Sequence, residues 1–407
     1  MASNAKNLAE LLNQDSTVAV GDIADGSVTT AKLADGGVTT AKVADNAVTS
    51  AKALNLGRRN VIINGAMEIA QRGTSATGKT SSGIYTVDRM ALGIDNLGTW
   101  TVTQESLTSG AAYNAGFKKA FRIDCTTADA SPASSDNIFF QYKLEGQDLK
   151  TFRKGTSSAK QFTLQFWVKS NKTGTGQVLL QDKDNNRYVG KTYTISSANT
   201  WEQKILTFPA DTTGAFDNDN NKSLEIEWAL DAGSDFTSGT LPATWTTGSN
   251  TQRSVNDFAL GDSTDNDWAI TGIQLEAGGT ATDFEHRNRT EELHLCYRYF
   301  RQIGRVMQGY REGYSTASIT IYPGMRREGN DADNIVGAIS GGSGVMYSRG
   351  AVNNSTGTLS GVVGHSSTST EQALQCSLAH NGTSTGSTYN GTVGGLYMDG
   401  FSLDAEL

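Results

Sequence analysis

The chain has 407 residues, with 34 Lys or Arg against 42 Asp or Glu, so its formal net charge is -8 and its pI is near 5.1. This balance argues against nucleic acid as a partner, because nucleic-acid-binding domains present a basic surface. No run of eighteen apolar residues occurs, and the N-terminus has no basic segment leading into an apolar one. We therefore expect neither membrane insertion nor a secretory signal, and we expect synthesis in a cytoplasm.

Length and turn residues together predict several β-rich units. A chain of this length is too long for one ordinary core. Its 45 Gly against 4 Pro, with abundant Ser, Thr, Asn and Asp, supply many tight turns and leave room for few long helices. Cys125, Cys296 and Cys376 lie far apart in sequence and predict buried free thiols rather than a disulfide framework or a metal site.

Residues 1–17 predict a short amphipathic helix that needs a partner surface. Leu8, Leu11 and Leu12 fall on one of its faces, and Asn4 is a suitable N-cap. A helix this short is marginal alone. We expect it either to attach the chain to another protein or to bundle with copies of itself.

Residues 18–59 contain a ten-residue repeat with an apolar side chain at every fifth position. This spacing fits neither the alternation of a strand nor the 3.6-residue period of a helix. Short extended pieces reversing at Asp-Gly, or one helical turn per ten residues, both fit locally. Either way one chain cannot form a core, so the in-register spacing favours an oligomeric stalk over a flexible linker. The spaced residues are Val18, Ile23, Val28, Leu33, Val38, Val43 and Val48.

Tandem units such as VTTAKLADGG after a short helix resemble the proximal stalks of tailed-bacteriophage tail fibres. The resemblance implies a homotrimer that attaches to a phage tail or baseplate protein through its N-terminus.

Residues 60–285 predict an antiparallel β-sandwich, because short strand-like runs alternate with polar turns. In 162–168 the alternation is clean, and in 268–275 a bulge at Gly272 accounts for a shift of phase. The expected strands are 61–64, 84–92, 100–105, 119–125, 138–144, 162–168, 177–181, 191–195, 201–208, 224–230 and 268–275.

Two blocks of this region, NVIINGAMEIAQRG (60–73) with YTVDRM (85–90), and 267–300, resemble the opening and closing segments of a jelly-roll module common in phage tail fibres. That module is itself similar to carbohydrate-binding modules. Its pattern has a large aromatic where this chain has Met90, and a proline where it has Asp283.

The sequence predicts no catalytic or metal site and no cofactor. His286, His294, His365 and His380 show no zinc-binding spacing, so solvated or capping roles are favoured. Residues 217–228 begin like a calcium loop but lack the sixth-position Gly and the twelfth-position carboxylate, which favours an Asx-turn. A structural calcium of other geometry stays open. The pairs Glu225/Glu227 and Asp182/Asp184 have a spacing of about 7 Å that suits inverting glycosidases, and surface charge explains them equally.

Trp245 is the favoured sugar-stacking residue of the sandwich. It lies in a turn-rich loop, whereas Trp167, Trp201, Trp228 and Trp268 lie in strand patterns and are expected in the core, and Trp100 is ambiguous.

Residues 286–301 predict a connecting helix over 290–300, with Leu293, Cys296, Tyr297 and Phe300 buried. Residues 302–407 predict a smaller C-terminal β tip. Its Gly-, Ser-, Asn- and Tyr-rich loops suit recognition, and we expect a host cell-surface polysaccharide or lipopolysaccharide to be met there. The candidate residues are Tyr347, Arg349, Asn353, Asn354, Tyr389 and Asn390.

Taken together, the sequence predicts a mainly β, trimeric fibre of the virion that binds a host glycan without cleaving it. The alternatives are a purely structural fibre or adaptor of tail or capsid, and a depolymerase spike. The absence of a long parallel β-helix pattern disfavours the spike.

The five-residue spacing makes a prediction about the full chain in solution. Light scattering should give a mass three times the chain mass of 43.2 kDa, because only pooled chains bury the spaced Val and Leu residues. A stable monomer with an intact repeat would contradict the stalk.

Overall fold

The computed structural model describes residues 58–256 and 258–303, and after them the backbone of short strands between residues 310 and 404. The expected helix of residues 1–17 and nearly all of the repeat, including every attachment residue from Leu8 to Val48, lie outside the described residues. Within the described part of the chain, no helix has the length and apolar character needed to cross a bilayer.

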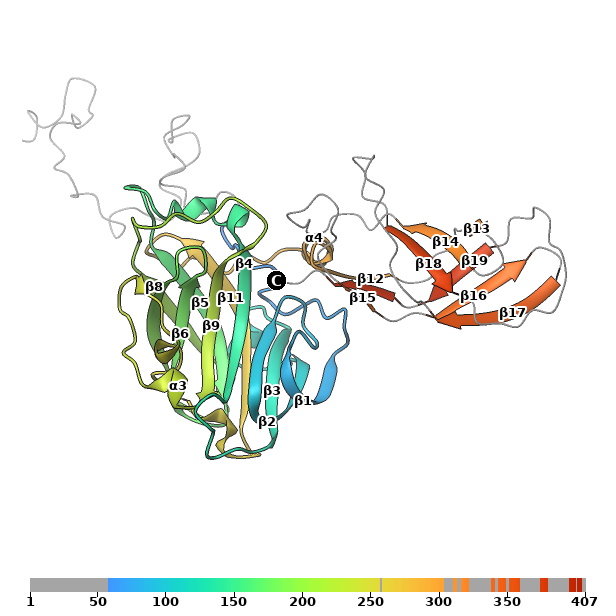
Figure 1. The fold of residues 1–407 in the computed structure, drawn as a ribbon. Coiled ribbons are helices and arrows are strands. Elements are labelled where there is room, and N and C mark those ends of the chain that lie inside the picture. The colour runs from blue at the N-terminus through green and yellow to red at the C-terminus, as the bar shows by residue number, and fades with distance from the viewer. Residues whose placement is uncertain are drawn as a thin grey trace, which may run out of the picture. The chain divides into compact units, whose positions relative to one another are not determined.

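An antiparallel sheet of eleven strands forms residues 75–277 (Figure 1). Its strand order is β10-β7-β6-β9-β4-β2-β3-β11-β5-β8. The remaining strand, β1, pairs with β2 outside this order. The strands are β1 Ser75–Gly83, β2 Ala91–Ser106, β3 Lys119–Thr127, β4 Asn137–Glu145, β5 Phe162–Ser170, β6 Gly174–Asp182, β7 Arg187–Ile195, β8 Glu202–Phe208, β9 Lys222–Ala232, β10 Thr246–Thr247 and β11 Asp267–Ala277. Short helical turns lie between them: α2 Ala111–Asn114, η4 Gly146–Asp148, η5 Lys150–Phe152, α3 Ser234–Thr237, η6 Asn250–Gln252 and η7 Leu260–Asp262.

The long strand β2 folds this sheet into two layers. Its first half, Ala91–Asn96, pairs with β4, and its second half, Thr99–Ser106, pairs with β3. The register shifts between the halves, where Asn96 and Gly98 have positive φ, and such irregularities bend a strand. One layer therefore holds β4, β9, β6 and β7, and the other holds β3, β11, β5 and β8.

Large aromatic residues fill the space between the layers. Phe166 of β5 lies 5.6 Å from Trp228 of β9 and 5.3 Å from Tyr193 of β7, measured between ring centroids. Phe140 of β4 lies 5.4 Å from Trp268 of β11. Edge-to-face packing of this kind adds to the energy of burial. The predicted jelly-roll-like sandwich is confirmed.

Most expected strands are present, and two are wrong. Residues 61–64 form no strand: Ile63 N–H donates to Tyr142 Oη, and Asn64 has φ 61°, which begins a turn. In 84–92 only the last two residues are in a strand, because Thr86 to Arg89 turn and Arg89 has φ 72°. The strand β1 escapes prediction because its sequence, SATGKTSSG, is polar and mostly exposed. The bulge predicted at Gly272 is confirmed by a register shift and by φ 64° there.

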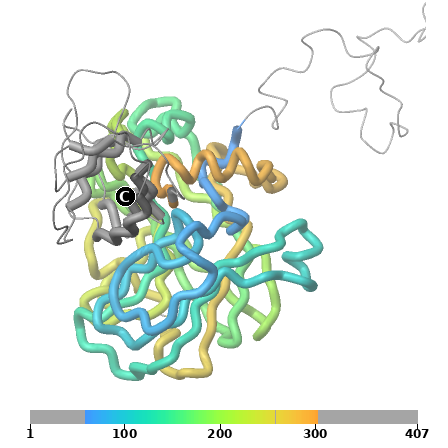
Figure 2. The backbone as a smooth tube through the Cα atoms, turned by 90° about the vertical axis from the view of Figure 1, so that its right-hand side faces the viewer, coloured from blue at the N-terminus to red at the C-terminus, as the bar shows by residue number. Residues whose placement is uncertain are grey.

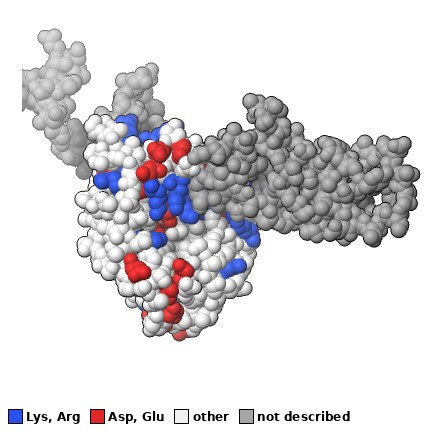
Figure 3. All heavy atoms as spheres, viewed as in Figure 1, with Lys and Arg blue, Asp and Glu red and all other residues white. Residues whose placement is uncertain are grey.

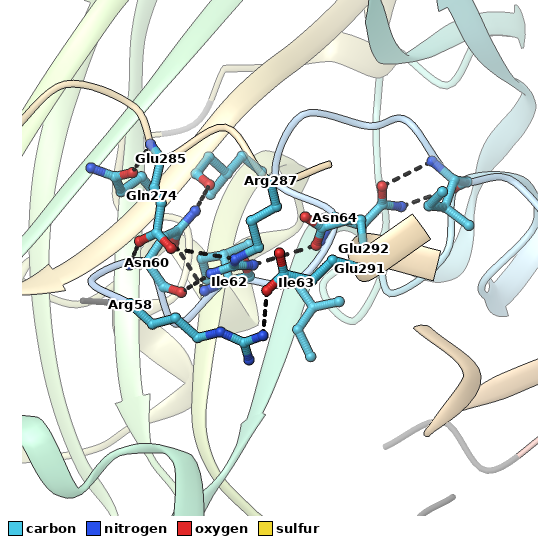
Figure 4. Close-up of polar contacts among 12 residues, drawn as sticks. Arg58, Asn60, Ile62, Ile63, Asn64, Gln274, Glu285, Arg287, Glu291 and Glu292 are labelled. Carbon is cyan, nitrogen blue, oxygen red and sulfur yellow. Dashed lines mark hydrogen bonds and ion pairs between the residues drawn. The ribbon is translucent and has the colours of Figure 1, made fainter. Parts of the chain in front are cut away.

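A network of hydrogen bonds, the terminal clasp, joins residues 58–64 to residues 273–292 (Figure 4). Glu285 Oε2 accepts the backbone N–H groups of Arg59 at 2.7 Å and Asn60 at 2.9 Å. The buried Asn60 side chain accepts from Leu275 N at 3.1 Å and donates to Ile273 O at 3.2 Å. Arg287 donates to the carbonyl oxygens of Asn60 and Ile62. Figure 2 shows the two segments running beside each other.

The helix α4, Arg289–Tyr297, completes the sandwich and ends three residues before its predicted end. Asn288 caps it by accepting from Glu291 N at 2.9 Å, and Glu292 accepts from Asn64 N. After it, Tyr299 and Phe300 are buried beneath guanidinium groups: Arg89 lies 3.5 Å from the Tyr299 ring centre, and Arg72 lies 3.5 Å from that of Phe300. Phe300 thus begins the strand β12, Phe300–Ile303, rather than closing the helix.

The C-terminal strands form three separate three-stranded sheets, ordered β12-β20-β15, β13-β14-β18 and β17-β16-β19. The last two strands, β19 and β20, each pair with other strands of this region. The region around Asn353, expected as a loop, is strand β17, which pairs with β16. The strands are β13 Tyr310–Glu312, β14 Thr316–Ile321, β15 Ala338–Ser340, β16 Ser343–Ser348, β17 Ala351–Thr358, β18 Leu374–Ala379, β19 Gly395–Asp399 and β20 Phe401–Asp404.

The clasp predicts an acid-sensitive step in unfolding. Burial raises the pKa of Glu285, but the backbone N–H groups of Asn60 and Arg59 and the charge of Arg287 outweigh it, so the pKa lies below its usual 4.5. A carboxyl whose pKa is lowered by folding stabilises above its unfolded pKa, and that stability is lost as the pH falls through the folded pKa. Between about pH 6 and about pH 3, the free energy of unfolding should therefore fall more in the wild type than in Glu285→Gln.

Urea unfolding at each pH measures this difference. The control is Glu291→Gln, which removes a carboxylate whose ion pair with Arg58 is exposed. Parallel pH curves for the wild type and Glu285→Gln would contradict the prediction.

Candidate ligand-binding face

Polar side chains line up across four strands on the outer face of the layer β4-β9-β6-β7. In β9 the residues Leu224, Ile226 and Trp228 are fully buried in the core, so the alternate residues Glu225 and Glu227 point outward. The register places Lys143 and Gln181 on either side of Glu225, and Tyr188 beyond Gln181. We call this set the polar row: Lys143, Glu225, Gln181 and Tyr188.

The segment 233–256 covers the same face beyond the polar row. Arg253 places two guanidinium nitrogens on Glu227, at 2.9 and 2.6 Å, and Gln141 Nε2 donates to Glu227 at 2.9 Å. Phe236 packs on Phe139 with ring centroids 5.6 Å apart. Glu227 is 0% exposed as a result. Within the polar row Glu225, Gln181 and Tyr188 are buried as well, and Lys143 is partly exposed.

Two lysines next to the polar row, Lys183 and Lys222, give this part of the face more positive than negative charge. Glu225 is almost fully buried and lies 2.8 Å from Lys222 Nζ and 3.3 Å from Lys183 Nζ. Burial raises the pKa of Glu225, but the charges of Lys183, Lys222 and Lys143 lower it by more. The pKa therefore lies below its ordinary value, and Glu225 is ionised. Lys183 also donates to Gln181 Oε1, while Gln181 Nε2 is buried without a hydrogen-bond partner among the described residues. Figure 3 shows basic and acidic side chains gathered over β4 and β9.

Trp245 is used in packing. It is 7% exposed, its Nε1 donates to Pro209 O at 2.8 Å, and its ring lies 5.5 Å from that of Phe162. Lys154 Nζ lies 5.0 Å from the same ring. Because the ring already has these neighbours, little of it is open to a sugar. Its role as a ligand residue stays a prediction.

Lys154 is the centre of a fully buried ion cluster. Its Nζ lies 2.5 Å from Asp182 and 3.1 Å from Asp211, and it donates to Gly214 O at 2.7 Å. Arg187 also pairs with Asp211 at 2.8 Å. These contacts tie the turn after β6 to the loop after β8. Burial raises the pKa of Asp211, but Arg187, Thr213 N–H and Lys154 lower it below its ordinary value.

The carboxylate pairs considered for glycosidase chemistry are engaged by neighbouring groups, and burial raises the pKa of Asp184. A general acid needs a raised pKa, whereas Glu225 has a lowered one. Glu227 is paired with Arg253, and Asp182 with Lys154. Asp184 accepts the backbone N–H of Asp217 at 2.9 Å. These contacts suit structural roles.

Other predicted residues have ordinary structural environments. His286 packs between Phe117 and Phe284, and Cys125 and Cys296 are buried free thiols. Burial raises the pKa of Cys125 to about 11. Asp219 accepts from Asn221 N at 3.0 Å, which is the expected Asx-turn. Among the residues that the structure describes, no three His, Cys, Asp or Glu side chains are arranged to hold a metal ion.

The tryptophans divide differently from expectation. Trp100, Trp228 and Trp268 are fully buried in the main core. Trp201 belongs to a small separate cluster, against which Trp167 packs while partly exposed. Trp167 lies between the inward-facing Phe166 and Val168, so strand alternation turns it outward, and the expectation of a core position was wrong.

The candidate residues of the C-terminal region are only partly described. Tyr347 lies in β16, and Asn353 and Asn354 lie in β17, so these three are on paired strands rather than in loops. Arg349, Tyr389 and Asn390 lie outside the described residues. The roles of all six in ligand binding stay predictions. Sequence reasoning missed the polar row because its members lie on strands far apart in sequence.

No protein-family model and no curated protein matches the sequence. Solved structures similar to about half of the chain include the enzymatically active domain of tailspike protein 4 of bacteriophage CBA120, 14% identical, covering 54% of this chain and 21% of that one, with a TM-score of 0.25. This chain thus spans about a fifth of that tailspike domain.

Two further similar structures are a putative sugar binding protein from Bacteroides thetaiotaomicron and the family 11 carbohydrate-binding module of a cellulase from Clostridium thermocellum. The first is 11% identical and covers 54% of this chain and 100% of that one, with a TM-score of 0.28. The second is 12% identical and covers 56% and 97%, with a TM-score of 0.24. At such TM-scores these similarities carry no functional argument.

The cover over the polar face makes a prediction about stability. Arg253→Met should lower the free energy of unfolding by about 3 kcal/mol or more, because it leaves the buried charge of Glu227 without its partner. Adding Glu227→Gln should restore part of this loss, since the neutral amide needs no counter-ion. Urea unfolding of the two single variants and the double variant measures the coupling. Strictly additive losses would contradict the pairing.

Proposed function

We propose that this chain is a fibre protein of a phage virion that binds a glycan on the surface of the host cell. The polar row is the observation that carries the binding part of the proposal. It places a buried amide, carboxylate and phenol beside the partly exposed lysines Lys143, Lys183 and Lys222 on one face of a rigid sheet. Sugar hydroxyls both donate and accept hydrogen bonds, so they need donors and acceptors in this mixture.

The rigidity of the strands supports this role. Lys143, Glu225, Gln181 and Tyr188 come from β4, β9, β6 and β7, whose backbones are fixed by the sheet. Groups held on strands keep their geometry better than groups on loops, which lowers the entropy lost on binding. Gln181 Nε2 is buried without a hydrogen-bond partner among the described residues, while Lys183 donates to the oxygen of the same amide.

The fibre part of the proposal rests on the sequence. The ten-residue repeat needs partner chains to bury its spaced apolar residues, and a trimer places three copies of the polar row on one particle. Several weak sites acting together bind much more tightly than one. The N-terminal helix would attach the fibre to the tail or baseplate, and residues 302–407 would add contacts to the receptor.

Binding without cleavage is favoured over a depolymerase. Glu225 in the polar row and its neighbour Glu227 are both paired with cations. Inverting and retaining hydrolysis both need a general acid with a raised pKa, whereas the pKa of Glu225 is lowered.

An array of bacterial lipopolysaccharide oligosaccharides, capsular fragments and β-linked hexasaccharides, probed with the full chain, tests the proposal. The wild type should retain at least one glycan, and Lys183→Gln should bind it about tenfold or more weakly, because a charge-assisted hydrogen bond is lost. Lys222 still pairs with Glu225 in this variant, so the carboxylate keeps a counter-ion.

The matched control is Lys160→Gln, which makes the same change of charge at an exposed residue outside the polar row. Its binding should equal that of the wild type. Retention of no glycan by the wild type would overturn the proposal, and equal loss in the two variants would show that only net charge matters.

A further inference from the structure

The outer face of the opposite layer, β3-β11-β5-β8, carries a group of aromatic side chains that is separate from the polar row. Trp167 lies there partly exposed, and Trp201 lies beside it at the start of β8. The register sets Gln203 opposite Trp167 and Ile205 opposite Gln165. We call this set the aromatic patch: Tyr113, Trp167, Lys169, Trp201, Gln203 and Ile205.

The aromatic patch is held firmly from beneath and from the side. Trp167 and Tyr113 pack against a small cluster that contains Phe117, Trp201 and Ala269. Lys169 Nζ lies 5.3 Å from the Trp201 ring centre and 3.3 Å from Glu105 Oε1. These contacts fix the surroundings of the Trp167 indole, so its exposed part is presented without further ordering.

Polar groups border the exposed part of this indole. Gln203 is exposed, and its Nε2 donates to Gln165 Oε1 at 3.1 Å, so its amide is oriented beside the ring. The ion pair of Lys169 with Glu105 lies farther along the same face. An apolar ring with an amide and a charged pair around it matches a pyranose, which has one face of C–H groups and hydroxyls at its edge.

The composition of the aromatic patch does not suit a protein partner. Ile205, at 53%, is the only large hydrophobic side chain that is exposed among the described residues. On β8 the alternate residue that shares its outer face is the polar Gln203. A stable protein interface buries about 1,200 Å² or more around an apolar centre, and one isoleucine with a partly buried indole does not provide it.

We propose that the aromatic patch is a second glycan-binding site, where a neutral pyranose ring stacks on Trp167 and hydrogen-bonds to Gln203. It extends the glycan binding proposed for the polar row, but it lies on the outer face of the other layer and has a different chemistry. The polar row is charged and suits hydroxyls or acidic groups, whereas the aromatic patch selects the apolar face of a sugar. Each chain would therefore hold two sugars independently.

Fluorine NMR of the full chain labelled with 5-fluorotryptophan tests the site directly. The six tryptophans give separate signals, and Trp167→Phe identifies that of Trp167. Each oligosaccharide retained on the array described above, with cellohexaose as a defined neutral probe, is then titrated. We expect the Trp167 signal to shift with at least one of them. If the Trp167 signal shifts with none of these oligosaccharides, the second site is overturned.

Calorimetry of the same oligosaccharides gives an independent readout. We expect two sites per chain in the wild type and one in Trp167→Ala, and Gln203→Ala should weaken the second site about tenfold. The control is Tyr85→Ala, which removes a partly buried aromatic residue elsewhere and should keep both sites. If Trp167→Ala does not fold, Gln203→Ala, which is on an exposed position, still decides the question.

The outcomes separate the two proposals. One site per chain that is lost in Lys183→Gln and kept in Gln203→Ala overturns the second site and leaves the proposed function intact. Binding of no oligosaccharide at either site overturns both.

Discussion

The sandwich depends on the terminal clasp, in which the buried Asn60 and the partly buried Glu285 bind the first described segment to β11 and the segment after it. Asn60 makes side-chain bonds to both Ile273 and Leu275 of β11, and Glu285 accepts two backbone N–H groups of residues 59 and 60. Without these two side chains the backbone groups that they bond would lack partners, at a cost of about 1–3 kcal/mol for each buried group. The clasp therefore links residues more than 200 apart in sequence and closes the two layers on each other.

Buried charges fix the loops at the edges of the sandwich in a similar way. Lys154 forms ion pairs with Asp182 at the end of β6 and with Asp211 in the loop after β8. Arg253 ties the segment 233–256 to Glu227. Buried ion pairs add little net stability compared with apolar packing, but removing one partner is costly. Their effect here is to specify position: the segment 233–256 covers part of the sheet face that carries the polar row.

The two proposed sites follow from one property of the sheet. Each strand turns alternate side chains to the core and to the outside, so every strand contributes to both the packing and the surface. In β9 the inward Trp228 and the outward Glu225 are three residues apart, and in β5 the inward Phe166 precedes the outward Trp167. A sandwich thus has two outer faces. In this protein one outer face carries charged and amide groups, and the other carries aromatic groups.

The sequence by itself determined the elements that local patterns control. The alternation in 162–168, the bulge at Gly272, the Asx-turn at Asp219 and the sandwich itself were predicted from spacing and turn residues, because these depend on neighbours along the chain. It also predicted the free thiols at Cys125 and Cys296. It missed β1, whose polar residues carry no apolar alternation. It also placed strands at 61–64 and 84–92, where Ile63 N–H donates to a side chain and the backbone of Asp88 and Met90 bonds in turns.

Only the tertiary structure decided which side chains meet. Trp245 seemed open from its turn-rich loop, yet Phe162 and Lys154, far away in sequence, enclose it. Trp167 looked like core from its strand pattern, yet the buried Phe166 and Val168 take the inner face and turn it outward. Lys143, Gln181 and Glu225 become neighbours only through the order of β4, β9 and β6. The physical reason is that strand pairing is non-local, so the register that builds a face is set by the whole sheet and cannot be seen in any single strand.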